Sequence, residues 1–167
     1  MSSLLERARE TLKIEIAGLE GLIERLGAEF EEAVKLLYAC QGKVILAGMG
    51  KSGLIAQKIA ATLTSTGTPA LFLHAGESTH GDLGIITKQD VVIAFSYSGE
   101  TNEVLQMIGH IQAIGVPLIA MTGKPDSTLA QAATVHLSIA VEKEACPLGL
   151  TPTASSTATL ALGDSLA

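Results

Sequence analysis

A glycine-rich segment with the spacing G-x-G-x-x-G follows a short apolar run near the middle of the chain. It spans residues 48–53 and reads GMGKSG. Glycines at such a turn let the backbone approach a ligand, and the unpaired N–H groups and dipole of the following helix attract an anion. We therefore predict an anion site with Gly50 and Ser52 among its binding residues; a merely tight turn is the alternative.

The residues that follow this segment narrow the choice of anion. A dinucleotide site requires an acidic residue at the end of the next strand, about 20 residues on, for the ribose hydroxyls. The corresponding run ends at Leu73-His74, and no carboxylate precedes Glu77. A Walker-type phosphate loop would need glycine where Ile45 stands. A smaller phosphate-bearing ligand fits the segment better than either nucleotide.

A second polar segment, residues 96–103 (SYSGETNE), follows the apolar run 91–95. In a flavodoxin-like sheet the first and third strands are neighbours, so this segment would face the glycine segment across one crevice. Ser96, Ser98 and Thr101 would then form a hydroxyl-lined cup suited to a phosphate monoester. Ordinary helix N-capping by Ser98 or Thr101 is the alternative, although it explains one such residue and not the set.

Composition excludes several classes of protein. The net charge is −6, aromatic residues make up 3% of the chain, and Lys and Arg form no cluster, which argues against a nucleic-acid-binding surface. No run approaches the roughly 20 apolar residues of a membrane span, and the charged N-terminus is unlike a signal peptide. Cys40 and Cys146 fit no metal or redox spacing. We expect a soluble, cytoplasmic protein with reduced thiols and no nucleic-acid or membrane partner.

The rest of the chain alternates between short apolar runs and helical patterns. Continuous apolar runs are typical of strands buried on both faces of a parallel sheet, and their alternation with helices indicates βαβ units. We predict an α/β fold with a flavodoxin-like, doubly wound, five-stranded parallel sheet. The expected strands are 44–47, 69–73, 91–95, 116–120 and 135–139, and the helices between them are 53–66, 101–114 and 126–133.

Helical periodicity also marks both ends of the chain. Helices over 4–26 and 28–40 form an expected N-terminal segment, residues 1–42, that packs on the domain or on a neighbouring subunit. Residues 43–167 form the expected binding domain. A last helix over 155–167 keeps its apolar pattern up to the final residue, so we expect the domain to be truncated at its C-terminus.

Three segments together resemble the sugar isomerase (SIS) family, and within it the arabinose-5-phosphate isomerases. They are TSTGTPALFLHAGESTHGDLG, SYSGETNE and KEACPLGLTPTASST, and the likeness extends from about residue 30 to the end. The resemblance implies the SIS fold, a homotetramer, and interconversion of D-arabinose 5-phosphate and D-ribulose 5-phosphate for synthesis of the lipopolysaccharide sugar Kdo. Full-length members continue into a histidine-bearing segment and a pair of CBS domains, and we expect this chain to be the isomerase domain without them.

The resemblance marks Lys51, Glu103, Glu144 and His80 as catalytic or ligand-binding positions. An enediol isomerisation needs a base, a partner for the developing oxyanion and a proton shuttle, and each acid–base group contributes about 10²–10⁴-fold. We expect Lys51 to pair with phosphate or oxyanion, and Glu144 to be the base, with a pKa raised by partial burial. The alternatives are a surface lysine, a dipole-favoured first-turn Glu103 and a solvated strand end at Glu144.

Further polar residues have weaker assignments. Thr153 and Ser155 precede the last helix and would bind the sugar or phosphate, or cap that helix. His80 is a substrate-binding candidate and, with His74 and Asp82, a weak zinc candidate, although the enediol route requires no metal or other cofactor.

The same binding loops would also suit a protein that senses a sugar phosphate without converting it. SIS domains also serve as sugar-phosphate-sensing modules, which need no acid–base residues. The joint presence of Lys51, Glu103 and Glu144 favours an enzyme, and a nucleotide-sugar end product is a further candidate ligand of the crevice. We expect His110, on an amphipathic helical pattern, and His136, within a strand, to be structural.

Overall fold

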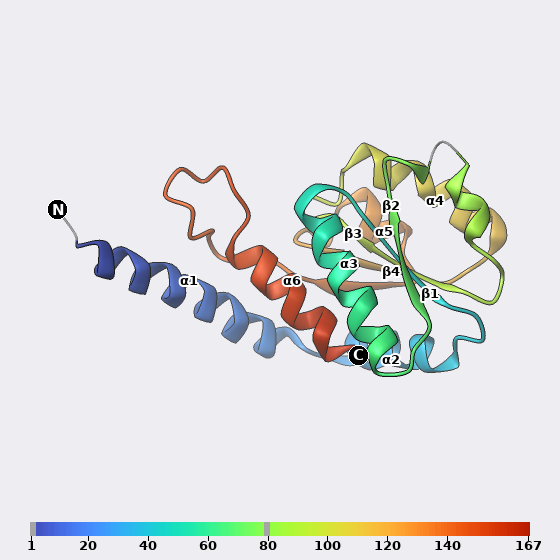
Figure 1. Ribbon diagram of the computed structural model, residues 1–167, viewed down its shortest axis with the longest axis horizontal. Coiled ribbons are helices and arrows are strands. Elements are labelled where there is room, and N and C mark those ends of the chain that lie inside the picture. The colour runs from blue at the N-terminus through green and yellow to red at the C-terminus, as the bar shows by residue number, and fades with distance from the viewer. Residues whose placement is uncertain (1–2, 79–80) are drawn as a thin grey trace.

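The computed structural model describes residues 3–78 and 81–167 and contains one parallel sheet of five strands in the order β2-β1-β3-β4-β5 (Figure 1). This is the flavodoxin-like order, and the predicted fold class is confirmed. The strands are β1 (Val44–Gly48), β2 (Ala70–His74), β3 (Val91–Phe95), β4 (Leu118–Thr122) and β5 (Val135–Ser138).

The sheet is covered on both faces, which explains its apolar strands. Every residue of β1, β3 and β4 is buried, and alternate side chains enter two separate cores. Val44 and Leu46 belong to one core, whereas Ile45 and Ala47 belong to the other. A strand placed between two helical layers has no solvent face, so its sequence is a continuous apolar run.

The helices divide between the two faces of the sheet. Helices α2 (Ala28–Ala39), α3 (Gly50–Ser65) and α6 (Ala154–Ser165) contribute side chains to the core around Val44. Helices α4 (Asn102–Ile114) and α5 (Thr128–Ala132) cover the opposite face. A short 3-10 helix, η2 (Asp82–Ile85), precedes β3. None of the helices in the described ranges combines the length and apolar character that crossing a bilayer requires.

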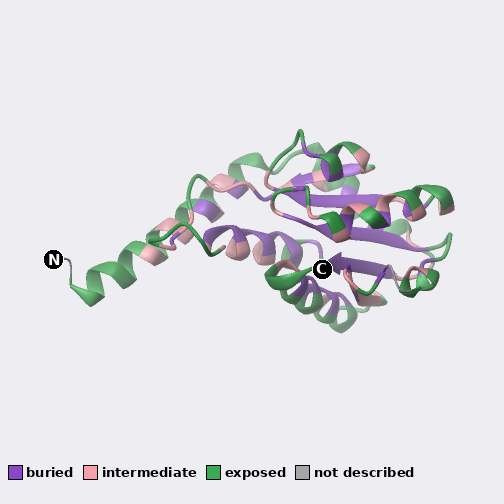
Figure 2. Ribbon diagram, turned by 90° about the horizontal axis from the view of Figure 1, so that it is seen from above, coloured by how far each residue is buried: buried purple, intermediate pink, exposed green. Residues whose placement is uncertain are grey.

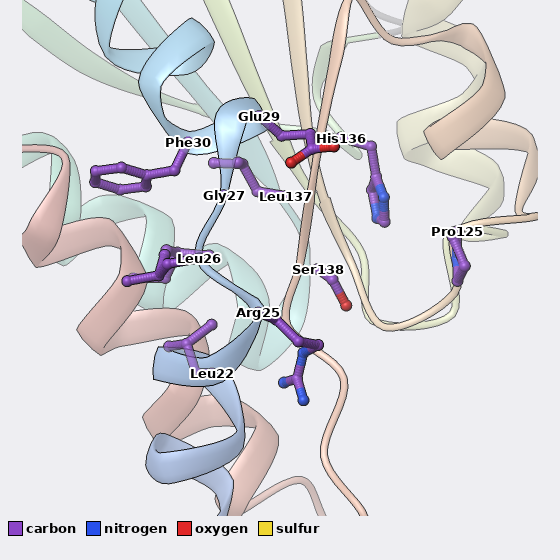
Figure 3. A pocket seen from close by; sticks show the side chains of 11 residues that line it. Leu22, Arg25, Leu26, Gly27, Glu29, Phe30, Pro125, His136, Leu137 and Ser138 are labelled. Carbon is purple, nitrogen blue, oxygen red and sulfur yellow. The ribbon is translucent and has the colours of Figure 1, made fainter.

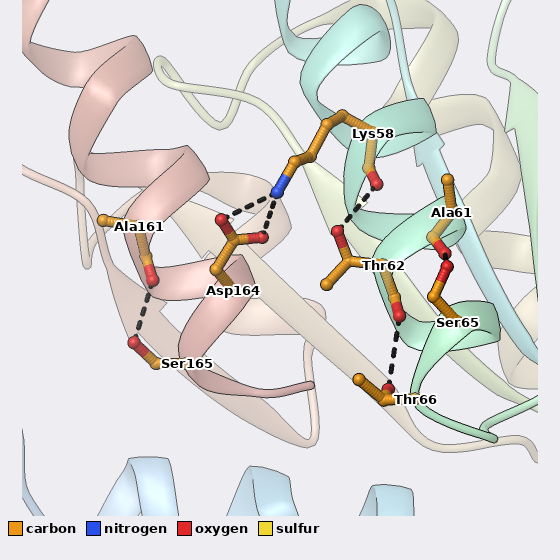
Figure 4. Close-up of polar contacts among 8 residues, drawn as sticks. All are labelled: Lys58, Ala61, Thr62, Ser65, Thr66, Ala161, Asp164 and Ser165. Atoms are coloured by element: carbon orange, nitrogen blue, oxygen red, sulfur yellow. Dashed lines mark hydrogen bonds and ion pairs between the residues drawn. The ribbon is translucent and has the colours of Figure 1, made fainter.

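Helices α3 and α6 lie side by side against the sheet and are joined by close packing and by charge (Figure 4). A Cβ atom at Gly163 would collide with Ile59, so the two helices approach more closely there than a larger residue allows. At the surface, Lys58 Nζ donates to both carboxylate oxygens of Asp164, at 2.6 and 2.7 Å. The position of α6 is therefore fixed relative to α3.

Helix α1 (Leu4–Arg25) begins with a capping box and runs beside α6. Ser3 Oγ accepts from Glu6 N at 3.1 Å, and Glu6 Oε2 accepts from Ser3 N at 2.6 Å. Thr157 Oγ1 of α6 donates to Glu15 Oε2 at 2.9 Å. The N-terminal half of α1 projects beyond the body and is exposed (Figures 1 and 2).

Element boundaries differ from the predicted ones in a few places. The strand expected over 116–120 is β4, Leu118–Thr122. Val116 N donates back to Ile111 O at the end of α4, and Pro117 O accepts from Val92 N of the neighbouring strand. Helix α3 begins at Gly50 and not at residue 53, so the glycine segment is itself the first helical turn. The last helix ends at Ser165.

Candidate functional site

The two loops predicted to bind a ligand lie at the same edge of the sheet. They follow β1 and β3, which are hydrogen-bonded neighbours with Ala47 opposite Ala94. Helix α3 leaves β1 for one face and α4 leaves β3 for the other, as their separate cores show. A crevice between diverging loops at the carboxyl ends of parallel strands is the usual ligand site of such folds.

The structure explains why positions 48, 50 and 53 are glycines. Gly50 has φ of 57°, in the left-handed region that favours glycine. A Cβ atom on Gly48 would lie 3.1 Å from Gly53 N, and one on Gly53 would lie 3.1 Å from Gly48 O. The strand end and the helix start therefore touch backbone to backbone. No side chain of the described residues caps α3, so its first N–H groups remain available to an anion.

The serine-bearing loop brings its predicted hydroxyls together. The buried Ser96 Oγ lies 2.8 Å from Thr101 Oγ1 and 3.5 Å from Ser98 Oγ, and it accepts from Gly99 N at 3.1 Å. Thr101 is the N-cap of α4, but no side-chain capping bond is found there among the described residues. Its hydroxyl is bonded to Ser96 instead, so the start of α4 is open to a ligand.

A contact from α5 holds this loop in place. Glu100 Oε1 accepts from Thr128 N, in the first turn of α5, at 2.7 Å. The Gly99 backbone has φ of 68° and packs so closely on Ser127 that a Cβ atom would collide with its side chain. Glu100 and Ser127 thus position the serine-bearing loop. Sequence reasoning did not identify either residue, because the partner of Glu100 is Thr128, 28 residues away, and Ser127 contacts the equally distant Gly99.

Glu144 is held against the N-terminus of α6 by four hydrogen bonds. Its Oε2 accepts from Thr153 N at 2.7 Å, Thr153 Oγ1 at 2.9 Å and Ser155 N at 3.3 Å, and its Oε1 accepts from Ser155 Oγ. The carboxylate therefore caps α6 from the loop that precedes it, 9 and 11 residues before the two backbone donors. The Thr153 and Ser155 hydroxyls predicted to contact sugar or phosphate are directed to this carboxylate.

The expected rise in the pKa of Glu144 is wrong. Burial does raise the pKa, but the hydrogen bonds from Ser155 and Thr153 favour the charged form and together lower the pKa below its ordinary value. A carboxylate placed at a helix N-terminus also benefits from the helix dipole. Glu144 is consequently ionised at neutral pH. That state suits a proton acceptor, although it is a weaker base than the expected one.

The remaining catalytic candidates are less constrained. Lys51 is exposed, in the first turn of α3, and Ser52 beside it is half-buried. Glu103 is half-buried in the first turn of α4. Neither Lys51 nor Glu103 makes a side-chain hydrogen bond or ion pair with another described residue. Within residues 3–78 and 81–167, no side-chain hydrogen bond or ion pair joins the glycine loop, the serine-bearing loop or the Glu144 cluster to one another. The two loops are neighbours because both follow strands at the same edge of the sheet.

The zinc hypothesis receives no support from the described part of the chain. His80 lies outside the described residues. Within them, no group of three or more His, Cys, Asp or Glu side chains is placed to hold a metal ion. His74 and Asp82, the other two residues of the hypothesis, belong to β2 and to η2.

The other two histidines are bonded to protein atoms. His110 Nε2 lies 3.1 Å from Leu83 O, and His136 Nε2 lies 2.8 Å from Thr122 Oγ1. His136 also lines a cavity of about 430 Å³ with Arg25 and Glu29 at the β5 edge of the sheet (Figure 3). Burial lowers the pKa of His136 below its ordinary value. This cavity is on the far edge from β2 and adjoins neither ligand loop.

Known proteins share the sequence and the fold of this chain. Residues 37–167 match the model of the SIS domain family. Arabinose 5-phosphate isomerase KdsD of Escherichia coli (strain K12) is 52% identical over 97% of this chain, and KdsD of Pseudomonas aeruginosa is 50% identical over 98%. The chain spans about half the length of these relatives, 49% and 50% respectively.

A solved structure extends the likeness to three dimensions. A protein of E. coli CFT073, solved in complex with arabinose 5-phosphate, superimposes with a TM-score of 0.94 and 42% identity. The match covers 99% of this chain and 89% of the other. With its strand order, its two carboxyl-edge loops and the family match over most of its length, this chain belongs to the SIS domain family.

Proposed function

We propose that this chain is the isomerase domain of an arabinose 5-phosphate isomerase, which interconverts D-arabinose 5-phosphate and D-ribulose 5-phosphate. The observation that carries the proposal is the 52% identity to KdsD over 97% of the chain. The paired ligand loops are the structural support, since hydroxyl and backbone N–H groups at two helix starts suit a phosphate monoester.

The phosphate is placed between the two loops. Ser96, Ser98 and Thr101 offer hydroxyls on one side, and Gly50 and Ser52 offer backbone N–H groups on the other. Both helices contribute a favourable dipole to a bound dianion. The sugar then extends from the crevice with its carbonyl end toward the acid–base residues.

The chemistry is a proton transfer through an enediol. A base removes the proton from C2 of the open-chain aldose, and the electron pair moves to O1 to give an enediolate. Protonation at C1 and transfer of the O2 proton to O1 complete the ketose without any change in redox state. We assign charge stabilisation to Lys51 and proton transfer to Glu103 and Glu144. This route requires no metal.

The wider setting follows from the same assignment. The arabinose 5-phosphate supplies the synthesis of Kdo for lipopolysaccharide, and the protein acts in the cytoplasm. A nucleotide-sugar end product competes with the sugar phosphate for the crevice. The assembly is a homotetramer. Large apolar side chains of α1 support self-association, because Leu4, Leu5 and Leu12 are 87%, 67% and 61% exposed.

Direct assay tests the activity. Arabinose 5-phosphate is added to the 167-residue chain and to a longer version that continues through the C-terminal half of its relatives, and ribulose 5-phosphate is measured. Turnover by the longer version, lost in Lys51→Met, is the expected result. Binding without turnover in both versions would refute the enzyme.

A sensing module without turnover is the second candidate. The hydrogen bonding of Glu144 favours it, because a carboxylate engaged by four donors at α6 is what a purely structural residue would show. The assay above separates the two, since a sensor binds the sugar phosphate and leaves it unchanged.

A further inference from the structure

His74 contains a buried polar atom that the fold leaves unsatisfied. Its Nδ1 is inaccessible to solvent and has no hydrogen-bond partner among the described residues, and its Nε2 takes part in none of the hydrogen bonds between them. By contrast, the described histidines His110 and His136 are bonded to a carbonyl and to a hydroxyl. Buried polar groups in folded proteins are nearly always paired, so His74 requires a specific explanation.

The position of His74 indicates a role for its other ring nitrogen, Nε2. It is the last residue of β2 and lies opposite Gly48, so its ring stands next to the glycine loop. With Gly50, Lys51 and Phe72 it lines a cavity of about 520 Å³ between β2 and the start of α3. The Phe72 ring meets the imidazole edge to face, with centroids 6.2 Å apart and planes at 87°.

The surrounding backbone also fixes the orientation of the ring. A Cβ atom on Gly76 would lie 3.1 Å from His74 Cε1 and 3.2 Å from Nδ1, so glycine at position 76 gives the Nδ1 side of the ring its space. Phe72 and Gly76 therefore hold the imidazole in one place. Such packing keeps a side chain positioned without using its hydrogen-bonding capacity.

The two nitrogens of a neutral imidazole differ in their hydrogen bonding. One ring nitrogen carries the proton and donates, and the other accepts. A buried N–H without an acceptor is costlier than a buried bare lone pair, which favours the proton on Nε2. Nε2 is then the donor of a ring that lines the same cavity as Lys51.

We propose that His74 is a substrate-binding residue whose Nε2–H donates a hydrogen bond to an oxygen of the sugar, not of the phosphate. The phosphate already has the serine-bearing loop and the start of α3, whereas the cavity beside β2 offers few other polar side chains, Lys51 and Gln57. This inference rests on the proposed function, because it assumes that a sugar phosphate occupies the crevice.

Three variants of the 167-residue chain test the proposal. His74→Leu removes the donor and also the unsatisfied nitrogen, and His74→Gln restores an N–H donor at about the position of Nε2. His136→Leu is the matched control, since it removes a paired histidine at the opposite edge of the sheet. Calorimetry measures affinity for arabinose 5-phosphate and for inorganic phosphate, and thermal unfolding measures stability.

We expect His74→Leu to bind arabinose 5-phosphate about tenfold more weakly, with unchanged phosphate affinity and an equal or higher melting temperature. His74→Gln should recover part of the lost affinity. The control should lose stability and keep its affinity for the sugar phosphate.

Two results would overturn the inference alone. One is wild-type affinity for arabinose 5-phosphate in His74→Leu, and the other is an equal loss of sugar phosphate and inorganic phosphate binding. Failure of the wild-type chain to bind arabinose 5-phosphate would instead overturn the proposed function, and the role of His74 with it.

Discussion

At the scale of single residues, Glu144 combines a structural and a proposed chemical role. Its carboxylate satisfies the Thr153 and Ser155 N–H groups at the start of α6, while its chemistry suits proton abstraction from a sugar. Hydrogen bonds to a charged group contribute more to stability than those to a neutral one. Substitution at this position therefore changes folding as well as turnover.

Glu144→Gln should lower the free energy of unfolding by about 1–3 kcal/mol at neutral pH, because one amide oxygen replaces two carboxylate oxygens as acceptors for Thr153 and Ser155. Urea denaturation measures the loss. Ser3→Ala, which removes an exposed cap at α1, is the control and should cost about 1 kcal/mol. Wild-type stability in Glu144→Gln would contradict the capping role.

The pH dependence of stability follows from the lowered pKa of Glu144. A carboxyl group whose folded-state pKa lies below its unfolded value stabilises the fold above the unfolded pKa. That stabilisation is lost as the pH falls below the ordinary value of 4.5 and through the folded pKa. The stability difference between wild type and Glu144→Gln should thus shrink in acid, measured by urea denaturation across the range. A constant difference would show that Glu144 is not the titrating group.

Lys51 and Glu103 differ from Glu144 because neither is engaged with another side chain or backbone group of the described residues. Lys51→Met and Glu103→Gln should therefore leave the melting temperature nearly unchanged and reduce turnover by about 10²-fold or more in a catalytically competent longer version. Steady-state kinetics measure the effect. Lys88→Met is the control for loss of a surface charge, because Lys88 lies in the turn before β3 and away from the two candidate ligand loops. Equal activity in Lys51→Met and the control would remove Lys51 from the mechanism.

At the scale of elements, the contact between α3 and α6 determines where the two helix starts lie. Helix α3 begins at the glycine loop and α6 begins at the Glu144 cap, so their mutual packing sets the distance between the proposed phosphate site and the carboxylate. Close packing at Gly163 and the ion pair of Lys58 with Asp164 both join them (Figure 4). We expect the buried contact to contribute more to stability than the exposed ion pair.

Gly163→Ala should destabilise the protein by about 1–3 kcal/mol, because the added methyl group overlaps Ile59 and forces the helices apart. The double variant with Ile59→Ala relieves that overlap, so a thermodynamic cycle should show favourable coupling. Lys58→Met, which removes only the exposed pair, should cost less than about 1 kcal/mol. Additive effects of the two core changes would mean that Gly163 and Ile59 do not share the contact.

At the scale of the whole molecule, the exposed apolar side chains of α1 predict self-association. Leu12→Glu with Ile16→Glu should lower the mass measured by light scattering, because both positions are more than half exposed here and charge there opposes burial in an assembly. Secondary structure by circular dichroism should be unchanged. The control pair Lys13→Glu with Glu20→Lys alters the polar residues of α1 and should keep the wild-type mass.

Much of this architecture was predictable from the sequence alone. Continuous apolar runs predicted all five strands of the sheet. The reason is clearest in β1, β3 and β4, where every residue is buried and no side chain faces solvent. The glycine spacing at 48–53 predicted the tight turn from β1 into α3, where a left-handed φ at Gly50 and the contact between Gly48 and Gly53 exclude larger residues. The hydroxyl residues after β3 do come together in the structure, with Ser96 bonded to Thr101, and their binding of a ligand stays a prediction.

Tertiary structure decided the rest. The pKa of Glu144 falls and does not rise, because residues 9 and 11 positions away fold back to donate to its carboxylate. The unsatisfied nitrogen of His74 depends on which neighbours reach it, and no local pattern in the sequence records that. Local spacing fixes backbone conformation and burial, whereas protonation and hydrogen-bond satisfaction depend on which polar groups the folded chain brings within reach of one another.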